Sequence, residues 1–314
     1  MPCSNFLRRA SAAATLAACA FTPAHAATGV ALPAWTCLHP DAIYASAFDA
    51  GDGAIPHDPS NGSGGVYPGN STRTVSLEHF GSHDYYVHVP TGYTPAHPWP
   101  VLLALAGAAG TTDAAIYQAK LMRTDWTSIA NASGFIVAAP VASGYYGGWI
   151  EPQIDGSGPS DYDVIAAVIA DLESAYNVER TRRYAWGYSA GGEVLHDIVL
   201  TGWSGMNADT FAGYAVTGAA LAGCPTYVAP IVPCVPAHAA RTIPPDIHIG
   251  TSDPYIALSY TRSDEAAFLG AGWDLDNTLF YTEFSDGSPP GGHTFSAAGL
   301  NAAWTAICPN AVTP

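Results

Sequence analysis

Residues 184–193 read Tyr-Ala-Trp-Gly-Tyr-Ser-Ala-Gly-Gly-Glu, and the predicted architecture is organised around them. Its central part, Gly187 to Gly191, has the Gly-x-Ser-x-Gly pattern of a nucleophile elbow, with Ser189 in the middle. An elbow is a strained turn between a strand and a helix that raises a serine hydroxyl above the edge of a sheet. Glycine is needed two residues before and after the serine because a Cβ there crowds the turn.

Strands and helices alternate around this stretch. Arg183–Trp186 is predicted to be the strand that enters the elbow, and Ala190–Leu200 the helix that leaves it. Short apolar runs predict further buried strands at Val101–Leu105, Phe135–Ala139, Phe211–Val216, Asp246–Gly250 and Leu279–Glu283. Helical spacing predicts Ala114–Ala130, Asp161–Tyr176, Ser259–Gly270 and Thr294–Ile307. We therefore expect one α/β domain with a mostly parallel sheet covered by helices on both faces.

An antiparallel hairpin is expected before this alternation. Arg73–His79 and Asp84–Val89 alternate in polarity and are predicted to pair around Gly81-Ser82. Residues 27–70 have little periodic pattern and are rich in glycine, which is typical of surface loop. The expected organisation is a signal peptide over residues 1–26, an irregular segment over 27–70 and a catalytic domain over 71–314.

The first 26 residues have the features of an export signal. Arg8 and Arg9 precede a short apolar run, and Ala24-His25-Ala26 fits a signal-peptidase site. The run is too short to span a bilayer, so no transmembrane segment is predicted here. We expect a secreted protein, extracellular or periplasmic; the alternative is a lipoprotein anchored at Cys19, because Leu16–Cys19 also resembles a lipobox.

The charge balance excludes some partners. Only 11% of residues are charged, the net charge is −16, and Lys120 is the only lysine. A chain with so few cations offers no basic patch, which argues against nucleic acid and anionic membrane surfaces. The composition suits a soluble exported protein with a neutral substrate, and we expect a monomer.

Four cysteines remain if residues 1–26 are removed: Cys37, Cys224, Cys234 and Cys308. An even number in an exported chain favours two disulfides, for which three pairings exist. We favour Cys224–Cys234, which closes a proline-rich loop, and Cys37–Cys308, which joins the two ends. The alternative is free buried thiols. None of the four has the spacing of a zinc site or of a catalytic cysteine.

A serine nucleophile needs a base and an orienting acid, and on an elbow of this kind both follow the serine, acid first. Asp253 comes directly after the predicted strand Asp246–Gly250, and His293 is the only histidine beyond it. We therefore predict Ser189, His293 and Asp253 as nucleophile, base and acid. Later acids are expected to be solvated: Asp264, Asp274 and Asp276.

Two backbone amides are predicted to hold the oxyanion. One is that of Ala190, after the nucleophile; the other lies in the loop Ala106–Gly110, where we name Ala108. Trp149 and Tyr188 are predicted walls of the substrate groove because aromatic faces stack on planar or hydrocarbon groups. For both, plain core packing is the alternative.

These motifs together resemble a known family. The block Asp161–Glu193, the segment His248–Pro254 and the histidine loop Gly291–His293 are similar to secreted polyhydroxybutyrate depolymerases and feruloyl esterases. The resemblance covers roughly residues 101–308. It implies an α/β-hydrolase fold, hydrolysis of carboxylic esters through an acyl-serine, and no metal or organic cofactor. One departure is Ala106-Gly107, where relatives usually carry His-Gly.

Other functional classes are less favoured. The sequence has neither a glycine-rich phosphate loop after a strand nor a His-Glu-x-x-His metal helix. A serine peptidase of the same fold would share the three predicted residues and stays open as an alternative. A binding protein that has lost catalysis is the non-enzymatic alternative. Polyester, phenolic ester and small soluble ester are not distinguished by the sequence.

Overall fold

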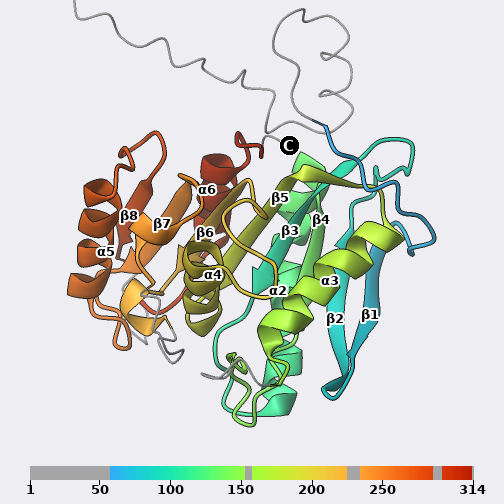
Figure 1. Ribbon diagram of the computed structural model, residues 1–314, viewed down its shortest axis with the longest axis horizontal. Coiled ribbons are helices and arrows are strands. Elements are labelled where there is room, and N and C mark those ends of the chain that lie inside the picture. Colours follow the sequence, from blue (N-terminus) through green and yellow to red (C-terminus); the bar gives the residue numbers. More distant parts are fainter. Residues whose placement is uncertain (1–56, 153–157, 225–233, 286–291, 313–314) are drawn as a thin grey trace, which may run out of the picture. The chain divides into compact units, whose positions relative to one another are not determined.

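An eight-stranded sheet forms the centre of the protein in a computed structural model, which describes residues 57–152, 158–224, 234–285 and 292–312 (Figure 1). The strands stand in the order β1-β2-β4-β3-β5-β6-β7-β8. Their bounds are β1 Gly69–Leu77, β2 Gly81–Val89, β3 Trp99–Leu105, β4 Ile136–Pro140, β5 Val178–Tyr188, β6 Gly213–Thr217, β7 Pro245–Gly250 and β8 Phe280–Phe284.

The sheet is antiparallel at its start and parallel thereafter. β1 pairs with β2 and β2 with β4 in antiparallel register, whereas every later pair from β3 to β8 is parallel. The predicted hairpin is therefore present, but its turn is earlier than expected. Leu77 pairs with Gly81, and His79 between them has a φ of 63°, so Gly81-Ser82 begins β2 instead of forming the turn.

Helices cover both faces of the sheet (Figure 1). One apolar layer joins the sheet to three helices, α3 Asp161–Ala175, α4 Ala190–Thr201 and α5 Leu258–Gly270. The other layer lies under α2 Thr112–Ser133 and α6 Ala297–Ile307. The strands between them are fully buried at β3, β4, β6 and β7, as expected for parallel strands covered on both sides. This architecture confirms the predicted α/β-hydrolase fold.

Local signals set the helix ends. The Thr111 side chain accepts a hydrogen bond from the amide of Ala114 at the start of α2, and Gly134 ends that helix in the left-handed region. α6 begins at Ala297, three residues later than predicted, because the Ser296 hydroxyl caps it by accepting from the amide of Gly299. Residues 294–296 therefore stay in the loop that carries His293.

The described part of the predicted irregular segment lies along the sheet. Residues 57–68 contain no helix or named strand, but the amide of Ser60 donates to the carbonyl oxygen of Val178, and Pro59 bridges to Glu179. The domain boundaries themselves stay a prediction, and the signal segment lies outside the described residues. Among the described residues, no helix is long and apolar enough to cross a bilayer.

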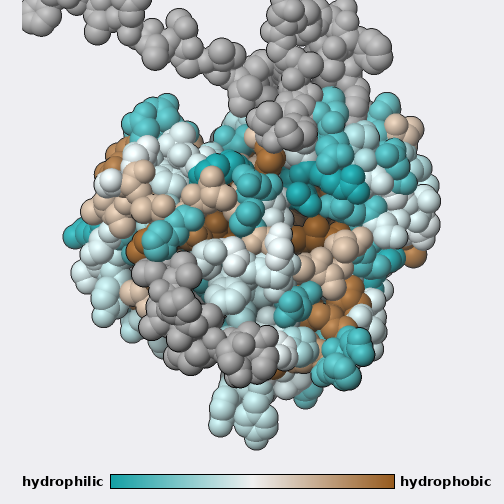
Figure 2. All heavy atoms as spheres, in the orientation of Figure 1, coloured by the Kyte–Doolittle hydropathy of each residue, from teal (hydrophilic) through white to brown (hydrophobic). Residues whose placement is uncertain are grey.

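The surface on the face of Figure 1 is mixed in character. Figure 2 shows hydrophilic and intermediate side chains over most of it, with hydrophobic side chains in separate patches.

Candidate active site

Ser189 stands at the junction of β5 and α4, with φ 52° and ψ −128°. A non-glycine residue adopts such a backbone only where its surroundings impose it. The flanking glycines make the turn possible. A Cβ on Gly187 would lie 2.4 Å from the carbonyl oxygen of Gly191, and one on Gly191 would lie 2.5 Å from that of Ala106. The Gly-x-Ser-x-Gly pattern is thus required because the backbone at each of these two glycines lies against another backbone segment.

The structure brings Ser189, His293 and Asp253 together from three loops. The Ser189 hydroxyl lies 2.9 Å from Nε2 of His293. Nδ1 of the same imidazole lies 2.7 Å from Oδ2 of Asp253. Both distances are those of hydrogen bonds, and they link a hydroxyl, an imidazole and a carboxylate in series.

The carboxylate of Asp253 is fully engaged. While Oδ2 faces the imidazole, Oδ1 accepts hydrogen bonds from the backbone amides of Tyr255 and Ile256 at 2.8 and 2.9 Å. Its side chain has no exposed surface, and that of His293 is only 9% exposed. Little water therefore competes for the contact between the two side chains, and the ring has one fixed orientation.

Three glycines whose role was not predicted from the sequence shape this arrangement. Gly218, directly after β6, has a φ of 62°, and a Cβ there would lie 3.1 Å from Nδ1 of His293. Gly250 and Gly292 bring the two loops into contact, because a Cβ on Gly250 would lie 2.1 Å from the carbonyl oxygen of Gly292. The sequence signal available was position alone: Gly218 and Gly250 stand at the carboxyl ends of strands.

The two predicted oxyanion donors flank the serine. Ala190 is the first residue of α4, where backbone amides have no acceptor within the helix. The loop of Ala108 lies against the serine, because a Cβ on Gly107 would be 2.9 Å from Cβ of Ser189. Ala108 itself is exposed, while the next amide, that of Ala109, already donates to the carbonyl oxygen of Gly147 at 3.1 Å. The donor role of Ala190 and Ala108 stays a prediction.

The two predicted groove aromatics have anchoring contacts. The Tyr188 hydroxyl donates to the carbonyl oxygen of His293 at 2.6 Å, and burial, helped by the charge of Asp253, raises the pKa of Tyr188 to about 12. Trp149 donates its indole N–H to the carbonyl oxygen of Ala106 at 2.8 Å. Both side chains are partly buried. Each therefore holds a loop of the site, and contact with a substrate stays a prediction for both.

Tyr255 is an aromatic neighbour of the site that sequence reasoning missed. Its ring centre lies 4.9 Å from that of His293 at an angle of 67°, and the residue is 70% exposed. Its place two residues after Asp253 was the available signal.

Two acids have raised pKa values, and one of them corrects an expectation. Asp264 was expected to be solvated, but it is buried and accepts a hydrogen bond from the amide of Leu221; burial raises its pKa to about 6. Glu193, on the first turn of α4, has its pKa raised to about 7, mainly by burial and also by the charge of Glu151. Asp274 and Asp276 are exposed, as expected.

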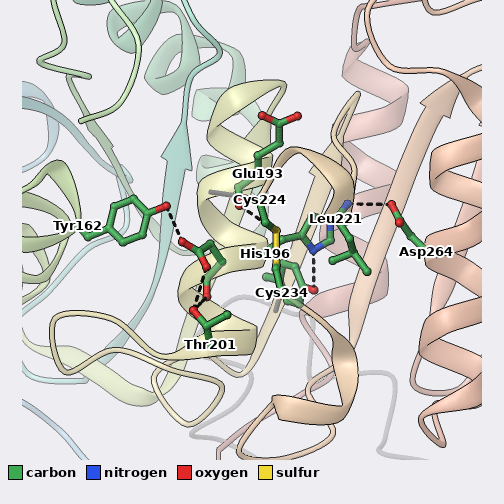
Figure 3. Close-up of a disulfide and its surroundings, with 10 residues drawn as sticks. Tyr162, Glu193, His196, Thr201, Leu221, Cys224, Cys234 and Asp264 are labelled. Atoms are coloured by element: carbon green, nitrogen blue, oxygen red, sulfur yellow. Dashed lines mark hydrogen bonds between the residues drawn. A yellow bond between two sulfur atoms is a disulfide. The ribbon is translucent and has the colours of Figure 1, made fainter. Parts of the chain in front are cut away.

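The predicted disulfide between Cys224 and Cys234 is present. Figure 3 shows it beside α4, where the Cys224 sulfur lies 3.8 Å from the carbonyl oxygen of Glu193. The bond therefore joins Cys224 and Cys234 next to the helix that follows the serine. The second predicted pairing involves Cys37, which lies outside the described residues, so Cys37–Cys308 stays a prediction.

A cavity of about 390 Å³ lies between the end of the sheet and α6. Thr217, His248 and Phe295 are among the residues that line it, and Ser189 is not. The Ser189 hydroxyl therefore does not open into this cavity. Within the described ranges, no group of three or more His, Cys, Asp or Glu side chains is arranged to hold a metal ion.

Comparison with known proteins confirms the fold. No family model matches the chain. A bifunctional acetylxylan esterase/xylanase from Neocallimastix patriciarum is 28% identical over 109 residues, which are 35% of this chain and 14% of that protein's length. The chain thus spans about a seventh of that relative. Among solved structures, a ferulic acid esterase has a TM-score of 0.54 at 16% identity, covering 76% of this chain and 96% of that chain.

Two further solved structures share the fold. A thermostable esterase has a TM-score of 0.51 at 18% identity, covering 77% of this chain and 60% of that chain. A putative dipeptidyl aminopeptidase IV from Bacteroides ovatus has a TM-score of 0.53 at 15% identity, covering 76% of this chain and 35% of that chain. At these identities the likeness establishes the α/β-hydrolase fold, which supports different chemistries.

Proposed function

We propose that this protein is a serine esterase that hydrolyses carboxylic esters through an acyl-serine intermediate. The observation that carries the proposal is the series of contacts from Ser189 through His293 to Asp253, at 2.9 and 2.7 Å. A serine hydroxyl is a weak nucleophile on its own, and this series supplies both the base and the group that orients it.

The proposed reaction has two steps. Nε2 of His293 takes the Ser189 proton as the oxygen attacks the ester carbonyl, and Asp253 stabilises the imidazolium through Nδ1. The amides of Ala190 and Ala108 hold the negative oxygen of the tetrahedral intermediate. His293 then gives its proton to the departing alcohol. Water, activated by the same imidazole, hydrolyses the acyl-enzyme and returns Ser189 to its free form.

A fluorophosphonate probe tests this directly because it reacts with an activated serine. The wild type should be labelled and Ser189→Ala should not. With p-nitrophenyl acetate, losing Ser189 or His293 should lower kcat by about 10⁴- to 10⁶-fold, and Asp253→Asn by somewhat less. An unlabelled wild type would favour the binding-protein alternative, and an Asp253→Asn variant with normal turnover would exclude that acid.

We propose more narrowly that the substrate is either a polyester of the polyhydroxyalkanoate kind or a feruloyl-type ester. The similarity of the chain to an acetylxylan esterase/xylanase and of its fold to a ferulic acid esterase supports an ester over a peptide. A panel of polyhydroxybutyrate film, methyl ferulate, p-nitrophenyl esters of rising chain length and dipeptide anilides separates the classes. Turnover of the anilides alone would favour the peptidase alternative.

We also propose that the protein is exported as a monomer after removal of residues 1–26, with no membrane-spanning segment. The Cys224–Cys234 disulfide supports export because disulfides persist in oxidising compartments. Mass spectrometry of the N-terminus of the protein recovered from its host distinguishes cleavage after Ala26 from a lipid on Cys19.

A further inference from the structure

Tyr255 has an unusual combination of a fixed backbone and an open ring. Its amide donates to Oδ1 of Asp253 at 2.8 Å, so its position is set by the acid that also orients His293. Its ring contacts the imidazole at a centroid distance of 4.9 Å, yet the residue is 70% exposed. A largely exposed aromatic ring is therefore held beside the base, with most of its surface open to contact with another molecule.

Tyr188, the other tyrosine near His293, is held differently. The Tyr188 ring lies 5.1 Å from the imidazole, but Tyr188 is partly buried and its hydroxyl is used by the carbonyl oxygen of His293. Gly218 lies against the edge that carries Nδ1. Among the described residues, two tyrosine rings contact His293, and Tyr255 is the more exposed of the two.

The chemistry places one half of the substrate near this ring. A general acid has to come within about 2.6–3.2 Å of the atom that it protonates, so the alcohol oxygen of the ester must approach Nε2 of His293. The acyl oxygen points instead toward the amides of Ala190 and Ala108. The alcohol half of the ester therefore lies next to the imidazole that the Tyr255 ring contacts.

We propose that Tyr255 is a specificity-determining residue that binds the alcohol half of the ester and favours alcohols with a ring that can stack on it. The inference rests on the proposed esterase function. Aromatic rings prefer offset-stacked or edge-to-face contact with other flat apolar groups. A ring-bearing alcohol gains this contact, whereas a two-carbon alcohol is too short to make it. The net charge of −16 adds a preference for alcohols without a negative charge.

Two acetate esters test the proposal because they share the acyl group and differ in the alcohol: benzyl acetate and ethyl acetate. Tyr255→Ala should lower kcat/KM for benzyl acetate by about three- to tenfold through a higher KM, the size expected for one aromatic contact. Its kcat/KM for ethyl acetate should stay within about twofold of the wild type. Tyr255→Phe, which keeps the ring, should retain the preference for benzyl acetate.

A matched control is Tyr117→Ala, which removes a tyrosine that is 61% exposed on α2 and should change neither ester. An equal loss of kcat on both esters would overturn the proposal, because it would mean that Tyr255 only positions His293. Unchanged kinetics with benzyl acetate would also overturn it. Both results leave the esterase function standing, whereas activity that survives in Ser189→Ala would refute its acyl-serine mechanism.

Discussion

Glu193 is expected to make the stability of this protein fall between pH 5 and pH 8. Its carboxylate is partly buried four residues after Ser189, and a Cβ on Gly223 would lie 1.9 Å from its Oε1. Burial, with the charge of Glu151, raises the pKa of Glu193 to about 7 from an ordinary value of 4.5. The native state therefore favours the neutral acid, and the unfolded chain has no such preference.

The sign and size follow from the two pKa values. Between about 4.5 and 7 the folded protein binds more protons at Glu193 than the unfolded chain, so stability falls as the pH rises through this range. At 1.36 kcal/mol for each pH unit between the two values, the full effect is about 3 kcal/mol. Partial exposure reduces it, and we expect roughly 1–3 kcal/mol.

The variant Glu193→Gln removes the ionisation and keeps the shape. Asp264, whose pKa is raised to about 6, titrates over the same range, so the quantity to measure is the difference in Tm between variant and wild type. The Tm of the variant minus the Tm of the wild type should increase by about 2–6 °C between pH 5 and pH 8. Glu78→Gln is the control, because the Glu78 side chain is 88% exposed. A Tm difference that is the same at both pH values would refute the reasoning.

Three further predictions concern the support of the site. Gly218→Ala should lower kcat by about tenfold or more with a smaller change in KM, because its Cβ would press on His293 and its φ of 62° disfavours alanine; unchanged kcat would contradict this. Tyr188→Phe leaves the His293 carbonyl without its donor and should lower Tm by about 2 °C, measured by differential scanning fluorimetry. Reducing the Cys224–Cys234 disulfide should lower the free energy of unfolding by about 2–3 kcal/mol. A Tm that dithiothreitol does not change would contradict this stabilising effect.

The positions of Ser189, Asp253 and His293 could be chosen from the sequence because the fold restricts them strongly. Carboxyl ends of parallel strands meet at one edge of a sheet, so a residue just beyond a predicted strand is already placed near the elbow. Counting strands along the chain was sufficient for Asp253, and the histidine loop followed from its place before the last helix.

Features that depend on tertiary contacts were not predictable in the same way. β5 begins at Val178, five residues before the predicted strand. Charged residues in this strand form ion pairs in the folded protein, where Arg180 and Arg183 contact Glu173. Such pairing hides the apolar alternation by which a strand is recognised. Asp264 was misjudged for a related reason, since α5 has little amphipathic character and only the contact with Leu221 shows that this face is covered.

The contact between Gly250 and Gly292 has a consequence for protein engineering. Because the two backbones are in contact at this point, the turn that carries Asp253 and the segment that carries His293 depend on each other for their positions. If only one of these two loops were replaced by that of a homologous enzyme, the new loop would no longer fit against the loop that was kept. Loop exchange aimed at new selectivity should therefore transfer residues 250–256 and 292–296 as a pair, with Gly218 retained beneath them.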